Sequence, residues 1–517
     1  MRVLEKRFPI WDRHKWTILM VIVFLGVAVR LYGINLPLVD SHQIRQAQTA
    51  MMTRNLYDDN LNIFRTRLDF LGNIPGYVIM EFPLMHGITA SLYYIFGVHE
   101  SIGRLVSVMF SVGAMFLIYG LARRFLTKIG AFAALVLYTF SPMNIFFSRA
   151  FMPESSMLFF TIGAVYFLLK WIDKQTMILY VTAVIFAAIV GLTKPTAAII
   201  FIPLFAAWFI KYRWELFKRF DFWIYMVIAA FPCIFWVAYG YYFNSINSPP
   251  FGFGESWFEL VSKRGITEHW FDLSFYISVG SSIVLLLLTP LGFIGTVGGI
   301  FCVRKGNQRK FLYSWLGAIV LYFYALSGVV KGHMYYHLLL LPLAVIFFGF
   351  SVEWLLARCD FIKKMLKRKS VVFFGSVIAF LILCGYVVGY LKYFKYMYEN
   401  RMPHTLAAAE IIKEHTPKNR YILLTQPGAM PGAETYYSRS RTLYFFRGNG
   451  KKTIDELETE RKNGATTYLA LDTKYGSGVN ATKNDMVFWQ YLKEKYTTIA
   501  VTEHYLIFDI REPKEKM

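Results

Sequence analysis

The sequence predicts a polytopic α-helical membrane protein with about eleven spanning helices and a water-exposed C-terminal α/β domain. Of its 517 residues, 56% are hydrophobic and 18% are aromatic, and the mean hydropathy is +0.41. Charged residues make up 17%, whereas an ordinary soluble domain has roughly 25%. Long apolar runs alternate with short basic clusters, and the last part of the chain returns to a soluble-like composition.

The net charge of +22 does not indicate nucleic-acid binding. The cations stand between apolar runs, where membrane topology explains them, and form no continuous basic surface. The four cysteines match no zinc-site spacing, and none lies in the C-terminal domain.

The first apolar run, near 16–36, is long enough to span a membrane and follows a basic N-terminus. No small-x-small cleavage site precedes Asp40, so we expect an uncleaved anchor with a cytoplasmic N-terminus. The later runs lie near 103–122, 129–148, 153–171, 176–192, 196–211, 221–243, 274–302, 311–328, 334–356 and 371–391.

With that start, every basic cluster between spans falls in an inside loop, as the positive-inside rule requires. The clusters are Arg123, Arg124 and Lys128; Lys170 and Lys174; Lys211, Arg213, Lys218 and Arg219; Arg304, Lys305, Arg309 and Lys310; and Lys363, Lys364, Lys367, Arg368 and Lys369. The outside segments are then 37–102, 149–152, 193–195, 244–273, 329–333 and everything after about 392. The apolar run 82–98 is too short for a span and favours a re-entrant or interfacial helix.

The chain therefore divides into a transmembrane domain, 1–398, with outer-face loops 37–102 and 244–273, and an exported α/β domain, 399–517. In the latter, helices are expected at 404–415, 453–463 and 484–495, and strands at 421–425, 442–446, 467–471, 497–501 and 505–510. The glycines of 426–432 fit no phosphate-loop spacing and favour a turn with a following helix.

The first outside loop holds the leading catalytic candidate, Asp40. It precedes a polar stripe at helical spacing, formed by His42, Arg45, Gln46, Thr49 and Thr53. This pattern predicts a helix near the membrane surface. Asp40 is also placed to be its N-cap, with Gln43 at capping-box spacing, and His42 and Arg45 could form a solvated face.

Further ionisable groups fall on the same side of the membrane, where they are functional candidates. Glu81 is a second catalytic carboxylate candidate, and helix-start or solvated roles are open for it. Arg149 and Glu154 flank the start of a span, where helix-start chemistry explains Glu154 equally well. Lys194 lies in a tight outside turn against the charge rule, so anion binding or snorkelling must explain it. Lys331, His333 and His337 form a second cationic cluster, although His337 could be a satisfied interior histidine.

Carboxylates and cations on one membrane face suit glycosyl transfer from a lipid-phosphate sugar. A carboxylate base activates an acceptor hydroxyl, and cations stabilise the charge that grows on the departing phosphate. The apolar body offers a groove for the lipid tail.

Several short motifs, taken in order, resemble the bacterial protein-mannosyltransferase-like membrane glycosyltransferases of the GT-C fold (families 39 and 83), a group that includes the aminoarabinose transferases. They are Asp40-Ser41-His42 with Arg45-Gln46, Glu81-Phe82-Pro83-Leu84, Gly103-Arg104-Leu105, Pro153-Glu154 and Thr193-Lys194-Pro195. The resemblance covers roughly residues 15–350, and the exported domain is also similar. It implies a polyprenyl-phosphate sugar donor and a base in the first outer loop, where Asp40 matches.

The chain departs from these relatives at two positions. Many carry Asp-Glu where this chain has Asp40-Ser41, and the aminoarabinose transferases carry a lysine where it has Phe82. Contact with the donor phosphate would then come from Arg45, Lys194 or Lys331. These departures argue against aminoarabinose as the sugar.

The predicted function is inverting transfer of a hexose or pentose from a polyprenyl-phosphate donor to a glycan, lipid or protein acceptor at the outer face of the cell membrane. Two alternatives stay open: a lipid-linked sugar transporter, which would want midplane charges and inverted repeats, and a non-catalytic envelope-assembly protein. Cofactor use is undecided. Asp40, His42, His333 and His337 include competent divalent-metal ligands, but no spacing indicates a metal site.

Overall fold

The computed structural model describes residues 15–69, 75–247, 269–358, 395, 397–399, 403–415, 421–425, 432–445, 450–462, 466–472, 483–501 and 505–514. The expected span at 371–391 and most of the expected loop 244–273 lie outside the described residues.

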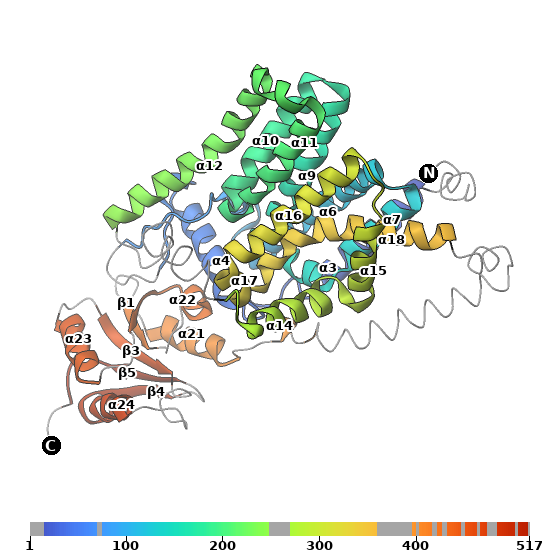
Figure 1. Cartoon of the computed structure of the whole chain (residues 1–517). Helices are drawn as coiled ribbons and strands as arrows, with labels where there is room; N and C mark the ends of the chain where they lie inside the picture. Colours follow the sequence, from blue (N-terminus) through green and yellow to red (C-terminus); the bar gives the residue numbers. More distant parts are fainter. Residues whose placement is uncertain are drawn as a thin grey trace, which may run out of the picture.

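The described residues up to 358 are mostly helical (Figure 1). Its α-helices are α3 (Lys15–Leu31), α4 (Gln43–Asp58), α5 (Leu84–Phe96), α6 (Glu100–Phe125), α7 (Lys128–Phe140), α8 (Pro142–Phe147), α9 (Glu154–Lys174), α10 (Met177–Thr193), α11 (Phe201–Tyr212), α12 (Phe220–Asn247), α14 (Leu273–Ser282), α15 (Thr289–Cys302), α16 (Asn307–Ala325), α17 (Ser327–Gly332) and α18 (Leu341–Arg358). Short helical segments of other types are η1 (Ile63–Arg65), η2 (Pro195–Ile200), η3 (Arg213–Lys218), η4 (Ile283–Leu287) and η5 (Met334–Leu340).

Within the described residues, five helices are long and apolar enough to cross a membrane, or up to six if one bent pair counts as a span. The five are Glu100–Phe125, Glu154–Lys174, Pro195–Lys218, Phe220–Asn247 and Met334–Arg358. The multi-pass helical architecture is thus confirmed, whereas the number of about eleven spans and their orientation stay predictions.

One expected span is sharply bent. The run 274–302 forms α14, the π-type segment η4 and α15, and its two halves are bent by 103°. The bend occurs at Thr289, which has a φ of 69°, directly before Pro290. Proline lacks an N–H and clashes with the carbonyl one turn earlier, so an apolar pattern alone cannot keep the helix straight here.

A second break positions the candidate site. The run 129–148 is divided at Ser141, whose hydroxyl accepts a hydrogen bond from the Asn144 N–H and caps α8, with Pro142 as its first residue. The loop after α8 approaches α6 closely: a Cβ atom added at Gly103 would lie 2.3 Å from Phe151 Cζ. Only glycine allows this contact, which brings Arg149 and Arg104 to the same region.

The C-terminal residues form a mixed five-stranded sheet in the order β2-β1-β3-β5-β4. Strand β1 (Tyr421–Thr425) pairs in parallel with β2 (Arg441–Phe445) and β3 (Thr466–Asp472), and β5 (Tyr505–Asp509) pairs antiparallel with β3 and β4 (Thr497–Val501). The helices are α21 (Pro403–His415), α22 (Ala433–Ser438), α23 (Gly450–Lys462) and α24 (Lys483–Lys495). Each predicted strand is present within one residue of its expected bounds, and α22 is the helix expected after the 426–432 turn.

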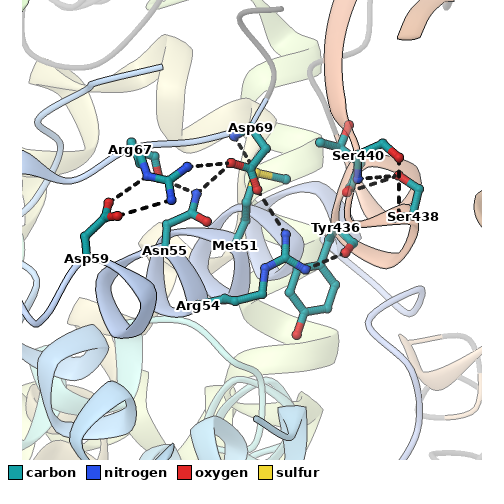
Figure 2. A network of polar contacts seen from close by, with 10 residues as sticks. Met51, Arg54, Asn55, Asp59, Arg67, Asp69, Tyr436, Ser438 and Ser440 are labelled. Carbon is teal, nitrogen blue, oxygen red and sulfur yellow. Dashed lines mark hydrogen bonds and ion pairs between the residues drawn. The ribbon is translucent and has the colours of Figure 1, made fainter. Parts of the chain in front are cut away.

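This α/β unit lies at one end of the helical body, and α22 packs beside α4 (Figure 1). Figure 2 shows the polar network at that junction. Arg54 of α4 donates to the Tyr436 carbonyl at 2.8 Å and to Asp69 Oδ2 at 3.0 Å, and Asn55 donates to Asp69 Oδ1 at 2.9 Å. One buried guanidinium therefore joins the C-terminal unit to the first long loop of the helical body.

Candidate active site

Asp40 lies in the irregular loop between α3 and α4 and is 2% exposed. Its Oδ1 accepts a hydrogen bond from the Gln46 side-chain amide, and its Oδ2 accepts one from Arg149. The residue that caps α4 is His42, with a φ of 56° and no side-chain capping bond. The interpretation of Asp40 as an N-cap paired with Gln43 is therefore wrong, because its carboxylate is engaged by partners farther along the chain.

Two fully buried arginines hold the Asp40 loop. Arg149 forms an ion pair with Asp40, and Arg104 Nη2 lies 3.7 Å from Asp40 Oδ2. The Arg104 side chain also donates to the carbonyls of Gly33 and Ile34, at 3.2 Å and 3.1 Å. The loop is therefore wrapped around two guanidinium groups that satisfy its carbonyls and face its carboxylate.

Glu81 and Arg45 form a second ion pair, in which Arg45 Nη2 lies 2.7 Å from both carboxylate oxygens. Burial alone would raise the pKa of Glu81, but the Arg45 guanidinium outweighs it and holds that pKa below its ordinary value of 4.5. The backbone beside Glu81 is fixed by α12: Trp236 donates to the Met80 carbonyl at 2.9 Å, and Asn244 exchanges two hydrogen bonds with Ile79. Glu81 is thus paired and only partly exposed, and it does not begin a helix, since α5 starts at Leu84.

Lys194 and Glu154 form a third pair, with Lys194 Nζ 2.8 Å from Glu154 Oε1. The ammonium also lies 4.5 Å and 4.1 Å from the ring centroids of Tyr335 and Tyr336, which is the geometry of a cation–π interaction. The second carboxylate oxygen of Glu154 has no hydrogen-bond partner among the described residues. One acceptor position of this buried carboxylate is therefore left for another donor.

The first turn of α4 joins these groups. Gln46 contacts Asp40, Arg45 contacts Glu81, and the His42 ring lies 5.1 Å from the Tyr335 ring beside Lys194. The polar stripe therefore faces the protein interior, and the expectation of a solvated face for His42 and Arg45 is wrong. Both side chains are partly covered, and Gln46, Thr49 and Thr53 are buried.

The three residues expected to form a second cationic cluster are divided. His333 lies near the α4 turn, 6.4 Å from His42 between ring centroids, and burial together with Lys194 and Arg45 lowers its pKa below 6.5. It is therefore neutral near pH 7 and is no cation. His337 is a satisfied interior histidine, with ring nitrogens 3.0 Å from Ser282 Oγ and 3.1 Å from the Val330 carbonyl.

Lys331 lies in a separate cavity, away from Asp40, Glu81 and Glu154. It donates to Asp272 at 2.7 Å and to Ser274 at 2.8 Å, and it lines a cavity of about 310 Å³ with His337 and three serines, Ser278, Ser281 and Ser282. In the part of the chain that the structure describes, no hydrogen bond or ion pair joins Lys331 or His337 to Asp40, Glu81 or Glu154. Among the described residues, no three His, Cys, Asp or Glu side chains are grouped as metal ligands.

Sequence reasoning missed several residues of this site. Arg104 appeared only inside a motif, although an arginine within an apolar run is itself a functional signal. Tyr335, Tyr336 and Tyr398 gave no signal, because tyrosines are frequent in this chain and only the fold brings their rings against Lys194 and Arg149.

Comparison with known proteins supports the GT-C resemblance. Residues 82–239 match the family model described as dolichyl-phosphate-mannose-protein mannosyltransferase. No curated protein matches the chain.

Solved structures match over almost the whole chain. ArnT from Cupriavidus metallidurans bound to undecaprenyl phosphate gives a TM-score of 0.67 at 13% identity, covering 96% of this chain and 98% of the other. The oligosaccharyltransferase AglB from Archaeoglobus fulgidus, in complex with an inhibitory peptide and a dolichol-phosphate, gives 0.58 at 11% identity, covering 95% and 74%. The mycobacterial arabinofuranosyltransferase AftD gives 0.56 at 12% identity, covering 96% and 41%. The chain is similar to these glycosyltransferases in fold, and that fold is GT-C.

Proposed function

From a chain with the GT-C fold, we propose an inverting glycosyltransferase that moves a sugar from a polyprenyl-phosphate donor to an acceptor hydroxyl at the outer face of the cell membrane. The observation that carries the proposal is the meeting of three carboxylates and their cationic partners around the first turn of α4. Asp40, Glu81 and Glu154 come from three separate segments, and each lies against an arginine or a lysine.

Asp40 is the proposed base. A carboxylate offers about four lone-pair sites, and Gln46 and Arg149 take one on each oxygen. A remaining lone pair of Asp40 accepts the proton of the acceptor hydroxyl, while the oxygen of that hydroxyl bonds to the anomeric carbon. The bond from that carbon to the phosphate oxygen breaks with its electron pair, polyprenyl phosphate leaves, and the configuration inverts. Glu81 is the alternative base, because its carboxylate is more exposed.

Arg45 and Lys194 are the proposed phosphate contacts. Each is paired with a carboxylate in this state, so donor binding would exchange part of that pairing for the phosphate. The same two cations then stabilise the charge that develops on the leaving phosphate. His42, Gln46, Arg149, Glu154 and His333 would shape the sugar and acceptor positions around them, whereas Lys331 and His337 would act only from their separate cavity.

The helical body supplies the apolar environment that a polyprenyl chain requires. Helix α12 exposes large apolar side chains along much of its length, including Val227, Phe231, Ile234 and Phe235 at 50% or more. Such a face is stable in lipid and costly in water. We place the α/β unit, residues 399–517, outside the cytoplasm, because that orientation follows from the basic loops.

The test is a transfer assay with purified protein in detergent and a panel of polyprenyl-phosphate sugars. Wild type and Asp40→Asn are compared, and mass spectrometry follows released polyprenyl phosphate and its dependence on acceptor. Turnover by wild type that vanishes in Asp40→Asn, with donor binding kept, supports both the reaction and the base. Donor binding without turnover for any pairing favours transport, and no binding to any donor overturns the proposal.

A further inference from the structure

The loop that carries Asp40 is held by residues from the far end of the chain. The Leu38 N–H donates to the Tyr437 hydroxyl at 2.7 Å, across 399 sequence positions. On the other side of Asp40, the Ser41 N–H donates to the Met397 carbonyl at 3.0 Å. Residues 37–41 lie in no helix or strand, so these tertiary partners satisfy the buried amides of Leu38 and Ser41.

A third contact acts on the partner of Asp40. The Tyr398 ring centroid lies 4.4 Å from Arg149 Cζ, and that guanidinium forms the ion pair with Asp40. Tyr398 is 8% exposed and packs edge-on against Tyr32 at the end of the first helix. The ring therefore fixes the plane in which Arg149 presents its donors.

Tyr437 is itself held rigidly, because its helix is fixed on α4. The Arg54 guanidinium donates to the Tyr436 carbonyl and lies 4.9 Å from the Tyr436 ring centroid (Figure 2). Tyr436 is also part of the apolar cluster that contains Leu38 and Met51. The Tyr437 hydroxyl that accepts from the Leu38 N–H thus belongs to α22, which is packed firmly on α4.

We propose that Tyr437 and Tyr398 are positioning residues for Asp40, so that the C-terminal α/β unit and the segment that leads into it set the geometry of the base. This inference rests on the proposed function. Neither tyrosine touches the substrate: Tyr437 fixes the main chain two residues before Asp40, and Tyr398 fixes the arginine that orients its carboxylate. A displacement of the order of 1 Å at a reacting group is enough to lower turnover strongly.

Tyr437→Phe removes only the hydroxyl that the Leu38 N–H requires. We expect kcat to fall about tenfold, equivalent to about 1.4 kcal/mol in the barrier, while the donor KM stays unchanged. The matched control is Tyr313→Phe, which removes a 2.9 Å bond from a tyrosine hydroxyl to the Ile300 carbonyl elsewhere in the helical body. Unchanged kcat in Tyr437→Phe would overturn the inference, and so would an increase, which would mean that the contact restrains the base.

Tyr398 allows a conservative rescue. Tyr398→Phe keeps the ring over Arg149 and should keep kcat near that of wild type, whereas Tyr398→Leu should lower kcat without changing the donor KM. Equal losses in both variants, or a loss confined to KM, would contradict a positioning role.

Hydrogen exchange measured by mass spectrometry separates this inference from the proposed function, because it needs no turnover. In Tyr437→Phe, a peptide covering 33–42 should exchange faster by about tenfold, while a peptide from α10 should not change. Faster exchange at 33–42 in a protein that transfers no sugar would support the structural role of Tyr437 and count only against the proposed function. Unchanged exchange at 33–42 would overturn the inference even in an active enzyme.

Discussion

Lys194 and Glu154, forty positions apart in the sequence, form an ion pair of 2.8 Å in which both side chains are almost completely buried. The pair explains why a lysine stands alone in a turn that was expected to lie on the side of the membrane poor in basic residues. Its ammonium has a carboxylate on one side and two tyrosine rings on another, so the charge is compensated inside the protein and needs no lipid headgroup.

Only one partner of this pair should be needed for donor binding. Lys194→Met removes a phosphate contact and should raise the donor Kd about tenfold, since charge-assisted hydrogen bonds contribute roughly 1.5–3 kcal/mol. Glu154→Gln removes the competing carboxylate and should keep or lower the donor Kd. Binding of a polyprenyl-phosphate sugar to detergent-solubilised variants measures both. Lys170→Met is the control, because Lys170 lies over the Tyr166 ring away from the site; equal effects of Lys194→Met and Lys170→Met would contradict the assignment.

Asp40 and Glu81 should be separable as base and supporting carboxylate. Asp40→Asn should lower kcat by about 10²–10⁴, the usual contribution of a general base. Glu81→Gln disturbs the Arg45 guanidinium but leaves the Asp40 pair intact, so its main effect should be a higher donor KM. Steady-state kinetics on both variants decide the matter: a collapse of kcat in Glu81→Gln with a mild effect in Asp40→Asn would reverse the two roles.

Sequence patterns predicted the strands of the α/β unit more reliably than the breaks within the long helices. The strands of the α/β unit were found within one residue, because alternating β-branched and aromatic residues between turn signals report local conformation directly. The break at Ser141 and the 103° bend before Pro290 were missed. Hydropathy averages over such positions, whereas proline acts at a single residue.

The candidate site was predicted as a set of residues but not as a set of contacts. Asp40 and Gln46 lie far from Arg149 in the sequence, and the structure joins all three because α8 ends beside the Asp40 loop. Lys331 and Lys194 are equivalent in the sequence by position and charge, yet Asp272 and Ser274 hold Lys331 in a separate cavity. Tertiary packing decides which cation pairs with which carboxylate, and no single sequence motif reports that packing.

Protonation of His333 should make the free energy of unfolding depend on pH in the mildly acidic range. Burial, with the nearby Lys194 and Arg45, lowers its folded-state pKa below the ordinary 6.5, so between these two values the unfolded chain binds more protons than the folded one. The free energy of unfolding should therefore rise with pH through that window and level off above about 6.5. Thermal unfolding in detergent from pH 5 to 8 measures this. Burial also lowers the pKa of His86, to about 4, so His333→Asn should reduce the slope in that window without removing it. An unchanged pH profile in this variant would assign the effect to His86 or another group.

The buried pair between Arg149 and Asp40 should show strong coupling in stability, independent of catalysis. Arg149→Met leaves the Asp40 carboxylate buried with Arg104 as its remaining cation, and breaking a buried pair costs about 3–5 kcal/mol. Asp40→Asn in the same chain removes the stranded charge, so the double variant should be more stable than Arg149→Met alone, with a coupling of about 1–3 kcal/mol. The exposed pair of Arg124 and Asp173 is the matched control, and the cycle of Arg124→Met with Asp173→Asn should give no more than about 1 kcal/mol. Additive effects at Arg149 and Asp40 would contradict this coupling and would show that Arg104 compensates the carboxylate without Arg149.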